Sequence, residues 1–82
     1  MRFTIDSEQF DTSDMRPFLL GLEGILAVYL NTDGRVFVRR AVGGTERFYE
    51  ADETGTEALA DSYGLPGLIG GSKKLRGRGR VH

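Results

Sequence analysis

The segment Asn31-Thr32-Asp33-Gly34 separates two runs rich in β-branched and aromatic residues, and it constrains the fold more than any other stretch of the chain. Asn and Asp favour a type I turn, and a glycine after them can take the left-handed conformation of a bulge residue. The segment therefore predicts a β-hairpin in which Leu30 pairs with Val36 and Val28 with Val38. One apolar face would then consist of Leu26, Val28, Leu30, Val36 and Val38, and the opposite face would carry Tyr29, Phe37 and Arg39.

A second turn, Val42-Gly43-Gly44-Thr45, predicts a two-residue hairpin of the primed type, because glycine adopts positive φ without strain. Residues 46 to 50 would follow as a strand paired with residues 37 to 41. This register places Phe48 beside Arg39 on the second face and Tyr49 on the apolar face.

The N-terminal part of the chain predicts one strand and one helix. Residues 2 to 6 alternate apolar and polar, which is typical of a strand with Phe3 and Ile5 facing the core. A polar stretch then leads to a helix in which Pro17 occupies the first turn and Gly24 supplies the left-handed C-cap. The apolar stripe of this helix would be Met15, Phe18, Leu19 and Leu22, spaced at i, i+3, i+4 and i+7.

A second helix is predicted from residues 54 to 57, TGTE, which have the form of a capping box. It would end near Tyr63, where Gly64 and Pro66 stop it. The expected fold is α+β, with the order β-α-β-β-β-α, an antiparallel three-stranded meander and a Gly-rich basic C-terminal tail. We therefore expect a core domain over residues 1–64 and a tail over residues 65–82.

Two stretches resemble nucleic-acid-binding folds. The order helix, three strands, helix in residues 15–63 resembles a double-stranded-RNA-binding domain in outline, although acidic residues replace the basic cluster with which the last helix of such domains begins. Residues 60–77 resemble a helix-turn-helix motif, which would imply DNA contact. Pro66 and the Gly70-Gly71 pair depart from that pattern.

Charge is distributed unevenly along the chain. The formal net charge is -1, but residues 1–70 hold six arginines and all twelve acidic residues, a net charge of -6, while residues 71–82 hold five basic residues and none that is acidic, +5. An acidic body with a basic tail favours binding to a charged partner. It also allows the tail to fold back on the body of the same chain or of a neighbour, so a homodimer is possible.

Composition excludes several classes of function. The chain has no cysteine, its histidine is the terminal His82, and no glycine-rich phosphate loop or activated nucleophile is present, so we expect no enzyme, no metal and no cofactor. The apolar runs are too short to span a membrane, and the N-terminal residues lack a secretory signal, which predicts a cytoplasmic protein. Because the chain begins with Met and ends without a tag, we expect a whole gene product.

The sequence therefore predicts a small non-enzymatic protein-binding module, an inhibitor or adaptor of the kind found in phages and mobile elements. It would dock on a larger protein, for example one that handles nucleic acids. Aromatic and arginine residues on the second face are the expected anchors, and an acidic segment would steer the chain toward a basic partner. The candidate residues are Tyr29, Phe37, Arg39 and Phe48, together with Glu46, Glu50, Asp52, Glu53, Glu57 and Asp61. The alternative is nucleic-acid binding through phosphate contacts of the tail residues Lys73, Lys74, Arg76, Arg78 and Arg80.

Overall fold

The computed structural model describes residues 1–65, 67 and 68. The chain divides into two units, the first spanning Met1–Ala51 and the second beginning at Asp52. The boundary expected after Gly64 falls within the second unit, and most of the expected tail lies outside the described residues. Antiparallel sheets are combined with helix, which confirms the α+β class.

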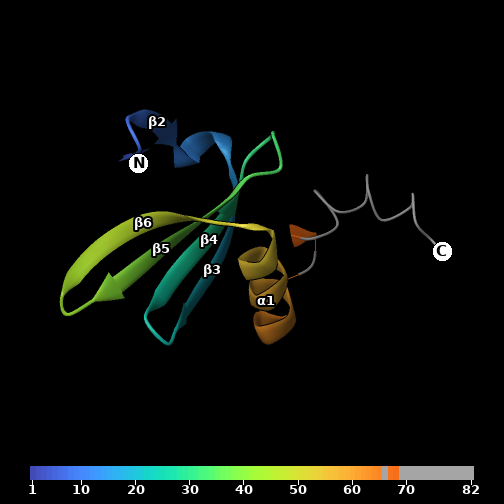
Figure 1. Ribbon diagram of the computed structural model, residues 1–82. Helices are drawn as coiled ribbons and strands as arrows, with labels where there is room; N and C mark the ends of the chain where they lie inside the picture. The colour runs from blue at the N-terminus through green and yellow to red at the C-terminus, as the bar shows by residue number, and fades with distance from the viewer. Residues whose placement is uncertain (66, 69–82) are drawn as a thin grey trace. The chain divides into compact units, whose positions relative to one another are not determined.

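The first unit contains two antiparallel sheets (Figure 1). Strands β1 and β2 form a two-stranded sheet, and β3, β4, β5 and β6 form a four-stranded sheet in sequence order. The expected three-stranded meander is therefore extended by one strand. The elements are β1 Arg2–Ile5, β2 Glu8–Asp11, the 3-10 helix η1 Thr12–Asp14, β3 Arg16–Leu22, β4 Ile25–Leu30, β5 Val36–Val42 and β6 Thr45–Ala51.

The hairpin between β4 and β5 has the predicted register, since Leu30 pairs with Val36 and Val28 with Val38. Gly34 has a φ of 86°, so it takes the left-handed bulge position that glycine adopts at low cost. The turn at Gly43 and Gly44 is confirmed as well: both have positive φ, 58° and 82°, as a primed turn requires.

The predicted helix over residues 15 to 22 is wrong, because residues Arg16–Leu22 form strand β3, paired with β4. The helical stripe is not buried: Leu19 is 79% exposed and Leu22 is 53% exposed, whereas Phe18 is buried opposite Val28. β3 is an edge strand, where the missing N–H of Pro17 is tolerated. β3 pairs with the next strand through a turn at Glu23 and Gly24, and helical periodicity does not reveal this pairing. Without this helix, the outline of a double-stranded-RNA-binding domain is also lost.

The polar stretch expected to lead into that helix contains strand β2, which pairs with β1. Asp6 and Ser7 connect the two strands with φ values of 50° and 70°. Positive φ at both central residues is the geometry of a type I′ turn, usually signalled by Asn-Gly or Asp-Gly. Because no glycine is present here, the sequence does not predict this hairpin.

One face of the four-stranded sheet buries Val28, Val36 and Val38, each at most 2% exposed. Tyr49 lies on this face, as predicted, but it is not part of the core, because it is 40% exposed. Tyr49 pairs with Val38 but belongs to β6, at the edge of the sheet, where fewer neighbours can cover a side chain. Leu26 and Leu30, also expected on the apolar face, are only partly buried; the register of β4 shifts between Ile25 and Ala27.

The second face of the sheet packs against the β1–β2 hairpin. Phe3 stacks on Phe48 with ring centroids 4.1 Å apart, and Phe10 lies 4.5 Å from Phe37. The second face is therefore a core rather than an open platform. The cluster comprises Phe3, Ala27, Tyr29 and Phe37, with Ile5, Phe10, Met15 and Phe48 packed against it.

Helix α1, Glu53–Tyr63, lies in the second unit. Its N-cap is Asp52, whose carboxylate accepts a hydrogen bond from the Gly55 N–H at 2.7 Å, so the prediction that Thr54 opens the helix is wrong by two residues. Asp is preferred over Thr at the N-cap, and Asp52 precedes Thr54 by two residues. The predicted C-cap is confirmed, since Gly64 has a φ of 61°.

Candidate functional site

The predicted aromatic anchors do not form an open surface. Phe37 has no exposed area and Tyr29 is 7% exposed, and both belong to the core beneath the β1–β2 hairpin. Phe48 is half-buried and covered by the ring of Phe3. In this structure neither Phe37 nor Tyr29 presents a surface to a partner, and their aromatic area stabilises the first unit instead.

Arg39 and Glu46 form an ion pair on the second face. The Arg39 guanidinium donates two hydrogen bonds to Glu46 Oε1, from Nε at 2.9 Å and from Nη2 at 2.7 Å. These bonds raise the pKa of Arg39. The predicted neighbour Phe48 lies directly across the strand pair from Arg39. Arg39 is thus already satisfied within the sheet and retains a 26% exposed side chain.

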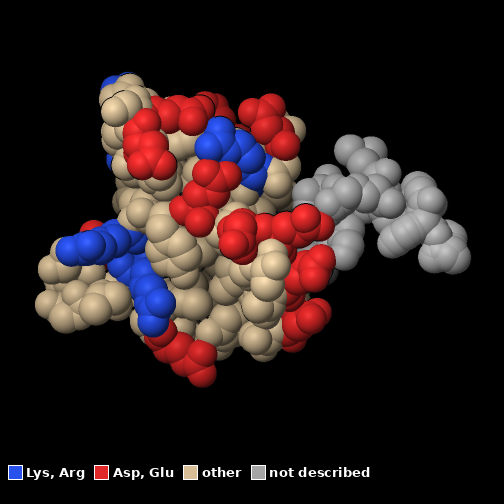
Figure 2. All heavy atoms as spheres, viewed as in Figure 1, with Lys and Arg blue, Asp and Glu red and all other residues tan. Residues whose placement is uncertain are grey.

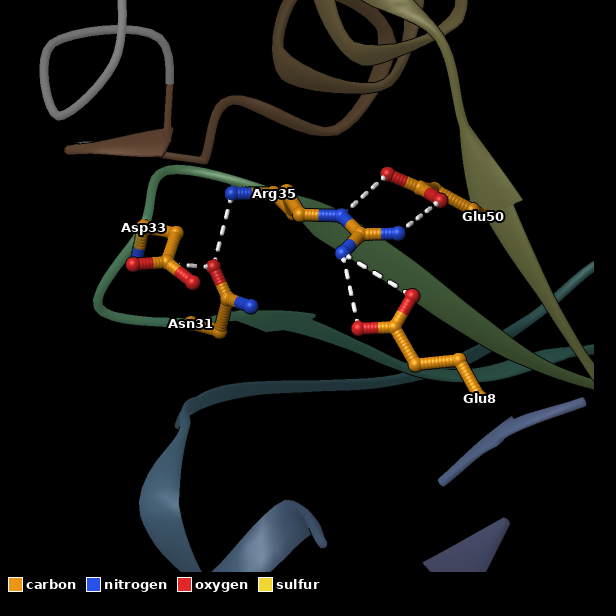
Figure 3. A network of polar contacts seen from close by, with 5 residues as sticks. All are labelled: Glu8, Asn31, Asp33, Arg35 and Glu50. Carbon is orange, nitrogen blue, oxygen red and sulfur yellow. Dashed lines mark hydrogen bonds and ion pairs between the residues drawn. The ribbon is translucent and has the colours of Figure 1, made fainter. Parts of the chain in front are cut away.

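Arg35 is the centre of a polar network that the sequence did not indicate (Figure 3). Its guanidinium binds Glu50 with two hydrogen bonds of 2.9 Å and reaches Glu8 of β2 at 3.3 Å. The group also lies over the rings of Phe10 and Phe37, 5.0 and 5.6 Å from their centroids. Arg35 therefore connects the β1–β2 hairpin to the four-stranded sheet. The sequence does not indicate this contact, because it does not predict strand β2.

The network shifts the pKa values of its members. Hydrogen bonding from Arg35 lowers the pKa of Glu50, and the same bond raises the pKa of Arg35. Because its pKa is lowered by the hydrogen bonds from Arg35, Glu50 is ionised at neutral pH. Its role in the first unit is that of an ion-pair partner.

The turn before Arg35 is also held by a side chain (Figure 3). Asn31 Oδ1 accepts hydrogen bonds from the backbone N–H of Asp33, at 3.0 Å, and of Arg35, at 2.8 Å. The side-chain oxygen of Asn31 thus takes the place of a backbone carbonyl oxygen as the acceptor in this turn. This contact fixes the backbone from which the Arg35 side chain projects.

The structure separates the predicted acidic segment into two groups with different environments. Glu46 and Glu50 are ion-paired on the first unit. In the second unit Asp52 caps α1, while Glu53, Glu57 and Asp61 follow at intervals of four residues, which places them on one helix face. Figure 2 shows acidic side chains gathered along α1. No lysine, arginine or histidine occurs within α1, so this helix carries a formal charge of -3.

The remaining predicted site residues lie elsewhere. The tail cations Lys73, Lys74, Arg76, Arg78 and Arg80, and most of the segment resembling a helix-turn-helix motif, are outside the described residues. Within the part of the chain that is described, no three His, Asp or Glu side chains come close enough to hold a metal ion. Among the same residues, no helix is both long and apolar enough to cross a membrane.

Comparison of the chain with protein-family models, with curated proteins and with solved structures found no match. The function must therefore be argued from the residues and their geometry.

Proposed function

We propose that this chain is a non-enzymatic protein-binding module, an adaptor or inhibitor, that docks on a basic surface of a larger protein through the acidic face of α1. The observation that supports the proposal is the spacing of Glu53, Glu57 and Asp61 along a helix without a basic residue. Carboxylates at i, i+4 and i+8 repel one another in the free helix, and a basic partner surface relieves that repulsion. Charge complementarity of this kind accelerates association and selects among partners.

The ion pairs of the first unit hold Glu46 and Glu50 within the four-stranded sheet. Glu46 and Glu50 have arginine partners within the chain, at 2.7 and 2.9 Å. Breaking those pairs to bind elsewhere would cost the hydrogen bonds that they already make. Glu46 and Glu50 are therefore left out of the proposed contact surface.

Affinity capture with the full chain tests this proposal. Extracts of the source cells are passed over the wild-type protein and over a variant carrying Glu53→Gln, Glu57→Gln and Asp61→Asn, and retained proteins are quantified by mass spectrometry. A matched control carries Asp6→Asn, Asp14→Asn and Asp33→Asn, which removes the same charge from exposed positions of the first unit.

We expect at least one basic protein that the wild type and the control retain and the helix variant loses. Its purified form should bind the wild type in calorimetry, with an affinity that falls as salt is raised. Equal retention of every captured protein by the helix variant and the control would contradict the proposal.

A second candidate function is nucleic-acid binding through the tail, which the sequence supports with five cations and no acidic residue in residues 71–82. Five phosphate contacts give a log-log salt slope of at most about -4.5 on duplex DNA. Fluorescence anisotropy of labelled single-stranded RNA and duplex DNA, with the full chain and with residues 1–70, measures this. Binding that is unchanged after removal of residues 71–82 excludes the tail as the binding element.

A further inference from the structure

The two edges of the four-stranded sheet differ in how open they are to another strand. The β3 edge contains Pro17 and a register irregularity between Leu19 and Leu22, devices that block strand pairing. In contrast, β6 pairs with β5 in continuous register over seven residues, from Ala51 to Thr45. An antiparallel edge strand directs the N–H and C=O groups of every second residue away from its neighbour. The β6 edge is thus the better template for an added strand.

Beside this edge lie two arginines without ion pairs among the described residues. Arg40 of β5 and Arg47 of β6 are directly opposite each other, and both are exposed. Like charges at opposed positions of a sheet are destabilising, and the side chains are only about 5 Å apart at Cβ. By contrast, the other two arginines of this hairpin region, Arg35 and Arg39, each have a glutamate partner. Among the described residues, no carboxylate forms an ion pair with Arg40 or Arg47.

The same face of β5 and β6 also exposes uncharged side chains. Tyr49, two residues from Arg47, is 40% exposed, and Val42, two residues from Arg40, is 58% exposed. Figure 2 shows basic side chains beside uncharged surface where Figure 1 places the β5–β6 hairpin. Arginine and tyrosine next to aliphatic groups are the composition of a protein interface. A single exposed ring does not make the stacking platform that successive bases of a nucleic acid require.

We propose that the β6 edge binds an extended acidic segment of a partner protein by strand addition, with an acidic residue of that segment facing Arg47 and Arg40. Backbone hydrogen bonds to β6 supply affinity, and the two guanidinium groups, which lie in one row across the strands, select a carboxylate at the position opposite Arg47. This site lies on the first unit and does not depend on the acidic face of α1. An adaptor then has two docking surfaces of opposite charge.

The test uses a labelled peptide of four Glu-Val repeats, whose glutamates all face one side of an extended strand. The full chain, labelled with ¹⁵N, is titrated with this peptide, and amide shifts are followed by NMR. We expect saturable shifts centred on residues 45–51 and slowed hydrogen exchange of the outward N–H groups of β6. No shifts in β6 at millimolar peptide overturn the proposal.

Variants of the protein and altered peptides test the two parts of the proposal, the contact with the arginines and the strand pairing, separately. Arg40→Gln with Arg47→Gln should weaken binding by about tenfold or more, whereas Arg2→Gln with Arg16→Gln, the matched loss of two charges, should change it less than about twofold. N-methylation of alternate peptide residues should abolish binding, since it removes strand pairing and keeps the charge.

Three results contradict strand addition by an acidic segment. The first is equal binding of the N-methylated peptide or of a Lys-Val repeat peptide. The second is a single-stranded oligonucleotide that binds the same residues more tightly than the acidic peptide. The third is sedimentation showing a dimer that already occupies β6 and that the peptide does not dissociate.

Discussion

The ring of Phe3 in β1 lies parallel to the ring of Phe48 in β6, with 4.1 Å between centroids and 2° between planes. These residues are separated by most of the length of the first unit, and their contact joins its two sheets. Isolated two-stranded hairpins are marginally stable in water, so β1 and β2 depend on this packing. The N-terminal hairpin is therefore part of the core of the unit.

Burial of Phe37 in that core predicts a large effect of truncation. Phe37→Ala should lower the free energy of unfolding by about 3–5 kcal/mol, because it removes a fully buried ring contacted by Phe3 and Phe10. The matched control is Leu19→Ala at a 79% exposed site, which should change stability by about 0.5 kcal/mol or less. Urea denaturation followed by circular dichroism measures both. Similar losses for the two variants would mean that Leu19 is buried after all.

The Arg35–Glu50 pair predicts a stability that depends on pH. The pKa of Glu50 is lowered in the folded protein by hydrogen bonding from Arg35, so folding favours the ionised carboxylate. The resulting stabilisation is present above the ordinary pKa of 4.5 and is lost as the pH falls through the lowered folded value.

Thermal unfolding between pH 6 and pH 3 should therefore show a smaller fall in stability for Arg35→Gln than for the wild type. Asp11, whose pKa is lowered by hydrogen bonds from Ser13, contributes a fall of its own in both proteins. Arg16→Gln should keep the wild-type dependence. A slope unaltered by Arg35→Gln would show that the pair does not shift Glu50.

The β4–β5 turn predicts that Asn31 acts through its side-chain oxygen. Asn31→Ala removes the acceptor of two backbone N–H groups and should cost about 1–2 kcal/mol of unfolding free energy. Asn31→Asp keeps an oxygen at that position and should cost less. Asp33→Ala, in the same turn, serves as the control, because it keeps the backbone N–H that donates a hydrogen bond to Asn31. Chemical denaturation ranks the three, and an equal cost for Asn31→Asp and Asn31→Ala would refute the role of the oxygen.

The cap of α1 predicts a difference between neighbouring residues. Asp52→Ala should destabilise the protein by about 1 kcal/mol, because it removes the acceptor of the Gly55 N–H. Thr54→Ala, at an exposed position inside the helix, should have little effect or stabilise slightly, since alanine is the better helix former. Melting temperatures distinguish them. If Thr54→Ala costs more than Asp52→Ala, the helix begins where the sequence first suggested.

Local turn chemistry made part of the fold predictable. Gly34, the Gly43-Gly44 pair and Gly64 occupy positions where positive φ is required, and few residues other than glycine tolerate it. These positions set the register of β4, β5 and β6 and the end of α1. Once the register was known, Phe48 could be placed beside Arg39 and Phe37 beside Tyr29 on one face.

Residues 15–22 show where local patterns are ambiguous. Met15, Phe18, Leu19 and Leu22 match a helical stripe, yet Phe18 alone among them is buried, in a strand. The strand forms because β4, the next strand along the chain, offers backbone partners that the spacing of these four residues does not show. The spacing of apolar residues likewise does not show strand β2, the Glu8–Arg35 contact or the covering of the aromatic face by the β1–β2 hairpin.

By itself the sequence determined the α+β class, the hairpin register and the uneven distribution of charge, because these follow from turn residues and composition. Only the tertiary structure decided that both faces of the sheet are buried, and which arginines have a glutamate partner. Phe37 and Tyr49 are both aromatic residues on neighbouring strands, yet one has no exposed surface and the other is 40% exposed. The physical reason is that the burial of a side chain depends on what packs over its strand. Phe37 is covered by the β1–β2 hairpin, which lies more than twenty residues earlier in the chain.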